Sequence, residues 1–129
     1  MTTLRSEILI DHPADEVWKV IEDVPAISSW FPAIVESTGD RTRRTVTLSD
    51  GSRLDEEVVT LDSRLRRLQY RAVGGDLPVT NHLGTVDVFE IDPGRSLVVY
   101  STEIEPAELA GAFGPACAEG LLGLRDALS

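Results

Sequence analysis

The sequence contains few cysteines, aromatic residues and basic residues. Its single cysteine, Cys117, excludes an internal disulfide and is typical of a protein in a reducing compartment. Residues 1–5 contain no apolar core of an export signal, and no run approaches the roughly 18 apolar residues that a membrane helix needs. We therefore expect a cytoplasmic protein without membrane insertion.

Positive charge is also scarce. The chain has 12 Lys and Arg against 22 Asp and Glu, a formal net charge of −10. Such a chain is repelled by phosphate backbones and by anionic membrane surfaces, which argues against a nucleic-acid partner. The two densest basic runs, residues 41–44 and 64–67, are interpreted as solvated strand ends.

Motifs for metal or cofactor chemistry are missing. There is no Gly-rich phosphate loop, no paired-cysteine zinc signature, no His-Glu-x-x-His and no Gly-x-Ser-x-Gly. The only histidines are His12 and His82. No metal and no cofactor are predicted. With 129 residues, 42% of them hydrophobic, the chain is long enough for one domain, residues 1–129, with a real core.

Local patterns near the start of the chain predict two short helices. Pro13 suits a first helical turn, and Asp15 and Glu16 complement the positive end of the helix. Pro25 should end this helix, and residues 26–30 form a second helical piece. The apolar stripe of the first helix consists of Val17, Val20, Ile21 and Val24.

Most of the remaining chain has the period of β-strands. Strands are predicted at residues 4–10, 34–37, 43–48, 53–61, 66–73, 82–91 and 96–104. Short turns between consecutive strands indicate an antiparallel meander. A helical region follows Pro106, and Pro115 should bend or restart it. Its apolar stripe has only the concave face of the sheet to pack against.

Strand alternation places a few polar side chains on that concave face. Val86 and Val88 should face the helix, and so should His82; the preceding strand turns Leu68 and Tyr70 inward. The period leaves the directions of Glu56 and Tyr100 open. Buried His or Glu is costly in a dry core, and only 5% of the residues are aromatic while ten are glycine. A pocket and a set of hydrogen-bonded core residues are both compatible with this pattern.

The order of several short motifs resembles one superfamily over the whole chain. The motifs are residues 11–18 with 30–32, 44–48 before the Asp50-Gly51 turn, 77–82 leading into Thr85-Val86, and 120–124. They resemble the START-like (SRPBCC) helix-grip superfamily, which includes polyketide cyclase/dehydrase and lipid-transport proteins, birch-pollen-allergen-like proteins and plant abscisic acid receptors. The resemblance implies an α+β fold: a curved seven-stranded antiparallel sheet around a long C-terminal helix, with two short helices after the first strand.

The resemblance also implies a central cavity for a small hydrophobic ligand. Glu56 matches an acidic residue that faces the cavity, His82 stands where many relatives have Tyr, and Tyr100 lines the pocket. Residues 49–52 and 75–81 match the two entrance loops. Val35 occupies the position of the lysine that holds a carboxylate in the hormone receptors, which argues against an abscisic acid receptor.

Three functions follow as hypotheses. The first is a binding protein for a small, mostly hydrophobic molecule. The second is a polyketide cyclase/dehydratase-like enzyme, in which His82 is the general base, Glu56 tunes it, and Tyr70 or Tyr100 donates a hydrogen bond to an enolate. The third is a partner-binding module. The sequence leaves the ligand, any reaction and the oligomeric state open. The predicted ligand-binding residues are Trp30, Glu56, Val58, Leu68, Tyr70, His82, Val86, Tyr100, Phe113 and Leu121.

Overall fold

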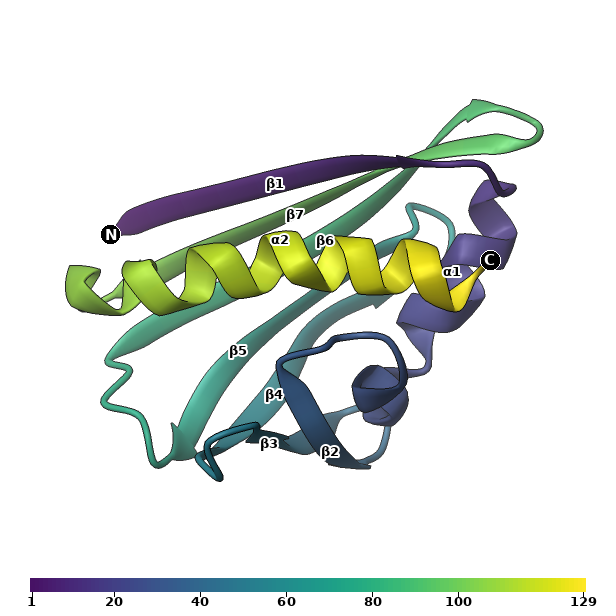
Figure 1. The fold of residues 1–129 in the computed structure, drawn as a ribbon. Helices are drawn as coiled ribbons and strands as arrows, with labels where there is room; N and C mark the ends of the chain where they lie inside the picture. The colour runs from purple at the N-terminus through teal and green to yellow at the C-terminus, as the bar shows by residue number, and fades with distance from the viewer.

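A curved antiparallel sheet wraps around a long C-terminal helix in the computed structural model, which describes residues 1–129 (Figure 1). The predicted α+β helix-grip fold is confirmed. The strands are β1 (Thr2–Ile10), β2 (Ile34–Gly39), β3 (Arg43–Leu48), β4 (Arg53–Asp62), β5 (Arg67–Gly75), β6 (Asn81–Asp92) and β7 (Arg95–Glu105). The helical segments are α1 (Ala14–Glu22), the 3-10 helices η1 (Val24–Ser29) and η2 (Ala107–Leu109), and α2 (Ala110–Ala127).

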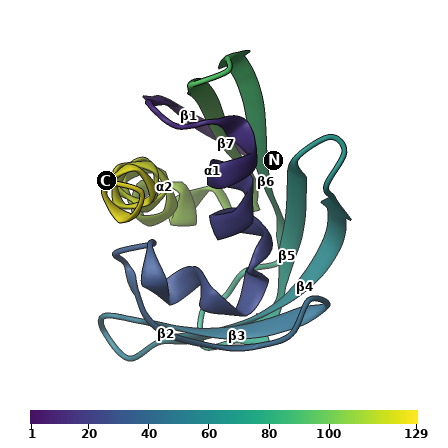
Figure 2. The ribbon, with the colours of Figure 1, turned by 90° about the vertical axis from the view of Figure 1, so that its right-hand side faces the viewer.

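The sheet has the strand order β1-β7-β6-β5-β4-β3-β2. Strands β2 to β7 follow one another as hairpins, and β1 closes the order by pairing with the last strand. Figure 2 shows the sheet curling from β1 round to β2, with α2 in the opening between these two edges. Helices α1 and η1 lie at one end of the concave face.

The two short helices follow an acidic segment with one proline, Pro13, and a second proline, Pro25, lies at the start of the second helix. Helix α1 begins directly after Pro13 and buries Val17, Trp18 and Ile21. The second piece starts at Val24 and is a 3-10 helix. Ser37 of β2 holds it in place, because its hydroxyl donates a 2.7 Å hydrogen bond to the carbonyl of Pro25.

Strand β4 departs from strict alternation. The register of β4 with β5 shifts between Val58 and Thr60, so that Leu61 pairs with Leu68. The hydroxyl of Thr60 instead bonds the side chain of Gln69 at 2.8 Å. An irregularity of one residue reverses which side chains face the core. Strict alternation would place Thr60 on the face of Val58, but after the irregularity Leu61 packs against the core instead.

Helix α2 runs through Pro115 without interruption. Of the two alternatives predicted for Pro115, a bend or a restart, the restart does not occur, because a proline removes a single backbone bond and the turns on both sides keep theirs. The buried residues of α2 are Cys117, Gly120, Leu121 and Leu124. No helix of the structure combines the length and the apolar character needed to cross a membrane.

At two glycines, the absence of a side chain makes room for an aromatic ring. A Cβ at Gly84 would lie 2.5 Å from Cζ of Tyr70, and one at Gly120 would lie 2.6 Å from Cε2 of Phe31. Both distances are too short for real atoms, so each ring occupies the space that a side chain would take. At these two positions a glycine therefore does not mark empty space in the interior.

Candidate functional site

A pocket of about 280 Å³ lies between the concave face of the sheet and the first half of α2. Of its 19 lining residues, 14 are hydrophobic, so its surface suits an apolar molecule. Ser49 and Asp50 from the β3–β4 loop and Leu77 from the β5–β6 loop belong to the lining. These are the two loops that the family resemblance implied as entrance loops.

The predicted site residues divide into two groups. Five line the pocket: Glu56, Tyr70, His82, Tyr100 and Phe113. The other five are Trp30, Val58, Leu68, Val86 and Leu121, which belong to the core or pack against it and are not among the lining residues. Strand parity predicts whether a side chain points inward, but it does not predict how far along the groove it lies. The second group packs together with residues such as Trp18 and Ile21 of α1 and Leu124 of α2 in the core.

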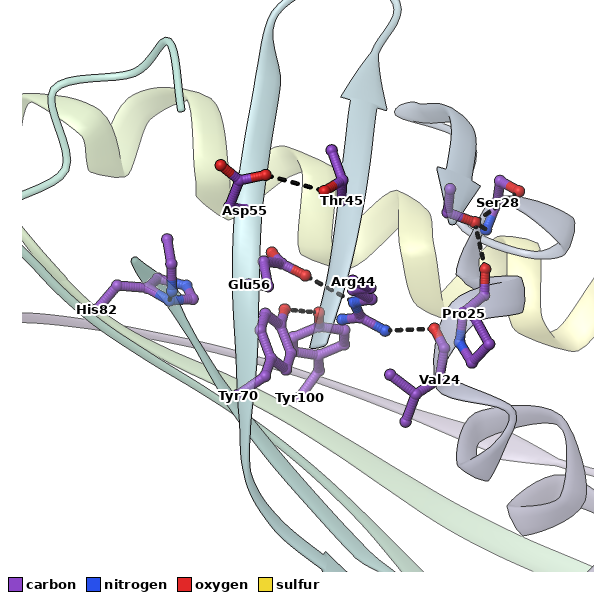
Figure 3. A network of polar contacts seen from close by, with 12 residues as sticks. Val24, Pro25, Ser28, Arg44, Thr45, Asp55, Glu56, Tyr70, His82 and Tyr100 are labelled. Atoms are coloured by element: carbon purple, nitrogen blue, oxygen red, sulfur yellow. Dashed lines mark hydrogen bonds and ion pairs between the residues drawn. The ribbon is translucent and has the colours of Figure 1, made fainter. Parts of the chain in front are cut away.

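A buried ion pair lies beside the pocket, and its carboxylate partner Glu56 belongs to the lining (Figure 3). Arg44 of β3 lies directly opposite Glu56 of β4, and its Nε donates to Oε1 of Glu56 at 2.7 Å. Its Nη1 donates to the carbonyl of Val24 at 3.0 Å, and its guanidinium lies 4.7 Å from the ring centre of Tyr70. Only 3% of Arg44 is exposed, and its Nη2 has no protein partner.

The interpretation of residues 41–44 as a solvated strand end is wrong at Arg44. The missed signal is alternation: Arg44 is two residues from Val46, so the two share the inward face of β3. An inward cation opposite an inward carboxylate in a hairpin is a cross-strand pair. The clustering of basic residues hid this position, since Arg41 and Arg43 are exposed as expected.

Burial changes the titration of both partners. Burial raises the pKa of Glu56, although the charge of Arg44 opposes the rise. Burial alone would lower the pKa of Arg44, but the carboxylate of Glu56 and the nearby tyrosines outweigh it and the net change is upward. The 2.7 Å contact is short, as expected of a charge-assisted hydrogen bond. Glu56 uses only Oε1 in this bond, and Oε2 accepts no hydrogen bond from the protein.

Two tyrosines lie beside the ion pair. The hydroxyls of Tyr70 and Tyr100 share a hydrogen bond, as Figure 3 shows. Burial raises the pKa of both phenols, and the carboxylate of Glu56 adds to the rise at Tyr70. Both are therefore neutral, and each hydroxyl is partnered by the other. Tyr100 faces inward, as the family resemblance implied.

His82 is held in one neutral form. The backbone N–H of Ala72 donates to its Nδ1 at 3.0 Å. Burial, with the positive charge of Arg44 adding to it, lowers the pKa of His82 to about 4. A neutral imidazole that accepts at Nδ1 carries its hydrogen on Nε2. His82 is thus placed to donate into the pocket, which differs from the general-base role predicted for it. Its ring lies 5.9 Å from the ring of Phe113.

Cys117 lies on the α2 side of the pocket. It is buried, and its Sγ is 3.5 Å from the hydroxyl oxygen of Thr102. Burial raises the pKa of the thiol, and the contact with Thr102 opposes this only in part. The thiol is therefore protonated and unreactive near neutral pH. No group of three His, Cys, Asp or Glu side chains is arranged to hold a metal ion.

Sequence comparison places residues 1–128 in the family described as polyketide cyclase / dehydrase and lipid transport. No protein of the curated set matches the sequence.

Solved structures repeat the fold. The chain is similar to XoxI from Bacillus cereus, with 25% identity and a TM-score of 0.90 over 98% of this chain and 95% of that one. It is similar to BexL, a di-domain ARO/CYC protein from the BE-7585A biosynthetic pathway, with 21% identity and a TM-score of 0.83 over 99% of this chain and 46% of that one. A START superfamily protein from Mycobacterium smegmatis has 14% identity and a TM-score of 0.75, over 98% of this chain and 93% of that one. The last two likenesses establish a START-like fold alone.

Proposed function

The chain belongs to the polyketide cyclase / dehydrase and lipid transport family, and from this membership we propose that its pocket binds a small, mostly hydrophobic molecule. The observation that carries the proposal is the distribution of polar groups around the pocket. Glu56, His82 and Thr102 come from strands, while α2 contributes the small or apolar wall. An apolar pocket with a few placed polar groups is the usual form of a small-molecule site. The residues of α2 in the lining are Ala112, Phe113, Ala116 and Cys117.

The position of the pocket supports the same proposal. It opens between two loops, and its lining includes the exposed Asp50, so a ligand has a route from solvent. The family description names lipid transport, which fits a hydrophobic ligand. A cytoplasmic location, the absence of a nucleic-acid partner and a single domain stay predictions from the sequence.

A thermal-shift screen with a library of apolar and aromatic compounds tests the proposal. Ala116 lines the pocket, so Ala116→Phe should fill it and abolish the shift caused by every hit. Ala118 is exposed on the same helix and outside the lining, which makes Ala118→Phe the matched control. A library without hits, or hits that stabilise Ala116→Phe as well as the wild type, would contradict binding in this pocket.

A cyclase- or dehydratase-like reaction is the second candidate. It is favoured by Glu56, a pocket-lining carboxyl whose pKa burial raises, as in many general acids and bases. Because Nδ1 of His82 accepts the N–H of Ala72, the better role for His82 is to donate from Nε2 to a substrate carbonyl. Turnover of a polyketide-like substrate that is lost in Glu56→Gln but only reduced in His82→Gln would support this assignment. Turnover that is lost in His82→Gln but only reduced in Glu56→Gln would support the general-base role of His82 instead.

A further inference from the structure

The charged side chains that line the pocket are all acidic. Its lining includes two carboxylates, Glu56 and Asp50, and no lysine or arginine. Asp50 lies in the exposed β3–β4 loop, where its carboxylate accepts the backbone N–H of Ser52 at 2.8 Å. This hydrogen bond lowers the pKa of Asp50, so the group is charged at neutral pH. A negatively charged ligand therefore meets an acidic side chain at the entrance, on a chain whose net charge is already −10.

Arg44, the cation that pairs with Glu56, does not offset this negative charge for an anionic ligand. Arg44 is not among the lining residues. Its Nε is bonded to Glu56, its Nη1 to the carbonyl of Val24, and its face covers the ring of Tyr70. Its Nη2 has no protein partner, but this atom is fully buried and presents no surface to the pocket. The pair carries no net charge toward the pocket. A carboxylate that enters would lose its water shell without gaining a counterion, and such a transfer is strongly unfavourable.

Uncharged polar groups of a ligand, in contrast, find hydrogen-bond partners in the pocket. Oε2 of Glu56 accepts no hydrogen bond from the protein, and Nε2 of His82 donates none. Neither atom is among the fully buried atoms without partners, so both have accessible surface. One is an acceptor and the other a donor. An uncharged molecule that carries both a donor and an acceptor satisfies the two groups, and a purely apolar one leaves them unpaired.

The volume limits the ligand further. An apolar cavity of about 150 Å³ holds benzene. By proportion, a pocket of about 280 Å³ encloses about 11 non-hydrogen atoms, and because it opens between two loops it takes a molecule of up to about 13. This is the size of one or two fused rings and is too small for a long-chain lipid.

Resting on the proposed function, we propose that the pocket selects uncharged molecules of one or two rings with a donor and an acceptor, and rejects carboxylates of the same shape. Calorimetric titration at pH 7 with 2-naphthamide and 2-naphthoate tests this, because the two probes have the same number of non-hydrogen atoms and differ in charge. The amide should bind at least about tenfold more tightly.

The possible results separate this proposal from the proposed function. Naphthoate that binds as tightly as the amide, or protonated 2-naphthylmethylamine that binds more tightly, overturns the selection for neutral ligands while binding itself stands. No binding of any of the three probes at millimolar concentration contradicts both the size assignment and the binding function.

Substitution of Glu56 gives a second test. Glu56→Gln keeps the shape of the side chain but leaves the buried charge of Arg44 uncompensated. The preference for amide over naphthoate should therefore fall by about tenfold or invert. If this variant does not fold, Asp50→Asn removes the exposed charge instead and should lower the preference about twofold at low salt. Asp126→Asn, the same change near the end of α2, is the control and should leave it unchanged. An unchanged preference in the folded Glu56 variant, or in Asp50→Asn, contradicts the proposal.

Discussion

Helix α2 crosses two different environments on one concave face. Its first half faces the pocket with Ala116 and Cys117, while its second half packs Leu121 and Leu124 into the core. Strand β6 changes in the same direction: His82 lines the pocket, and further along the same face Val86 and Val88 are core residues.

The comparison shows that the open space is confined to one end of the concave face. The same strands and the same helix build both halves, and two features distinguish them. Small residues on α2 leave space at one end, and α1 fills the other end with side chains such as Trp18 and Ile21. The scarcity of aromatic residues in the whole chain is therefore a poor guide to the position of the pocket.

Breaking the ion pair at the pocket end should have the largest effect on stability. Arg44→Met leaves Glu56 buried without a counterion, and loss of one partner of a buried pair costs about 3–5 kcal/mol. Unfolding in urea measures the change. Arg43→Met, at the exposed neighbouring position, should change the unfolding free energy by less than about 0.5 kcal/mol.

A double variant sharpens this prediction. Arg44→Met with Glu56→Leu removes both charges, and replacement of a whole buried pair by apolar residues is often neutral. The double variant should therefore be more stable than Arg44→Met alone. Equal losses in Arg43→Met and Arg44→Met would contradict the buried position of Arg44.

Truncations along α2 should separate the two halves. Leu121→Ala opens a cavity in a filled region and should lower the unfolding free energy by about 2–5 kcal/mol. Phe113 is half-buried and already borders the pocket, so Phe113→Ala should cost less, about 1–2 kcal/mol. Urea unfolding of both variants measures the difference. A larger loss at Phe113 would mean that the pocket end is packed as tightly as the other end.

Acid should destabilise the protein through His82. The pKa of His82 is about 4 in the folded protein and 6.5 for an ordinary histidine, so its contribution to stability is complete above pH 6.5 and is lost as the pH falls through 4. The full loss is about 3 kcal/mol. The raised pKa of Glu56 acts in the opposite direction, because protonation of Glu56 stabilises the folded state at low pH.

The informative measurement is therefore the difference between two proteins. Unfolding free energies of the wild type and of His82→Gln, followed from pH 7 to pH 4, should converge as the pH falls. The glutamine oxygen can still accept the N–H of Ala72, which keeps the local bond. If the two unfolding free energies instead stay a constant distance apart from pH 7 to pH 4, the lowered pKa of His82 in the folded protein is contradicted.

Gly84 tests the close contact with Tyr70, and its predicted effect is smaller than that of breaking the ion pair. The added methyl of Gly84→Ala would meet the ring of Tyr70 and push it toward the pocket, at a cost of about 1–3 kcal/mol in urea unfolding. Gly74→Ala is a matched control, because a Cβ there would lie 3.5 Å from the nearest atom, a side-chain oxygen of Asp55. Similar stabilities of the two variants would contradict the close contact at Gly84.

Sequence reasoning predicted the fold and part of the site. Regular alternation on β5 and β6 gave the inward positions of Tyr70 and His82, and the family resemblance gave those of Glu56 and Tyr100. The irregularity of β4 was missed because neither glycine nor proline marks it. Arg44 was missed because a cluster of basic residues suggested solvent, although the period of β3 pointed inward.

The apolar residues of α2 show a second limit of prediction from the sequence. A core leucine such as Leu121 and a pocket residue such as Phe113 have the same helical spacing, so the sequence pattern does not separate them. Their environments depend on where α1 and η1 come to lie, and that is a property of the assembled fold.

The central claim is that the space under the first half of α2 is open and takes a small neutral molecule, while the space under the second half is filled. A crystal structure of the protein soaked with 2-naphthamide tests it most directly. We predict density for the ring system between Phe113, Cys117 and Tyr100, with the amide near Glu56 or His82. Density elsewhere, or a pocket closed by side chains in a crystal saturated with the compound, would contradict the account.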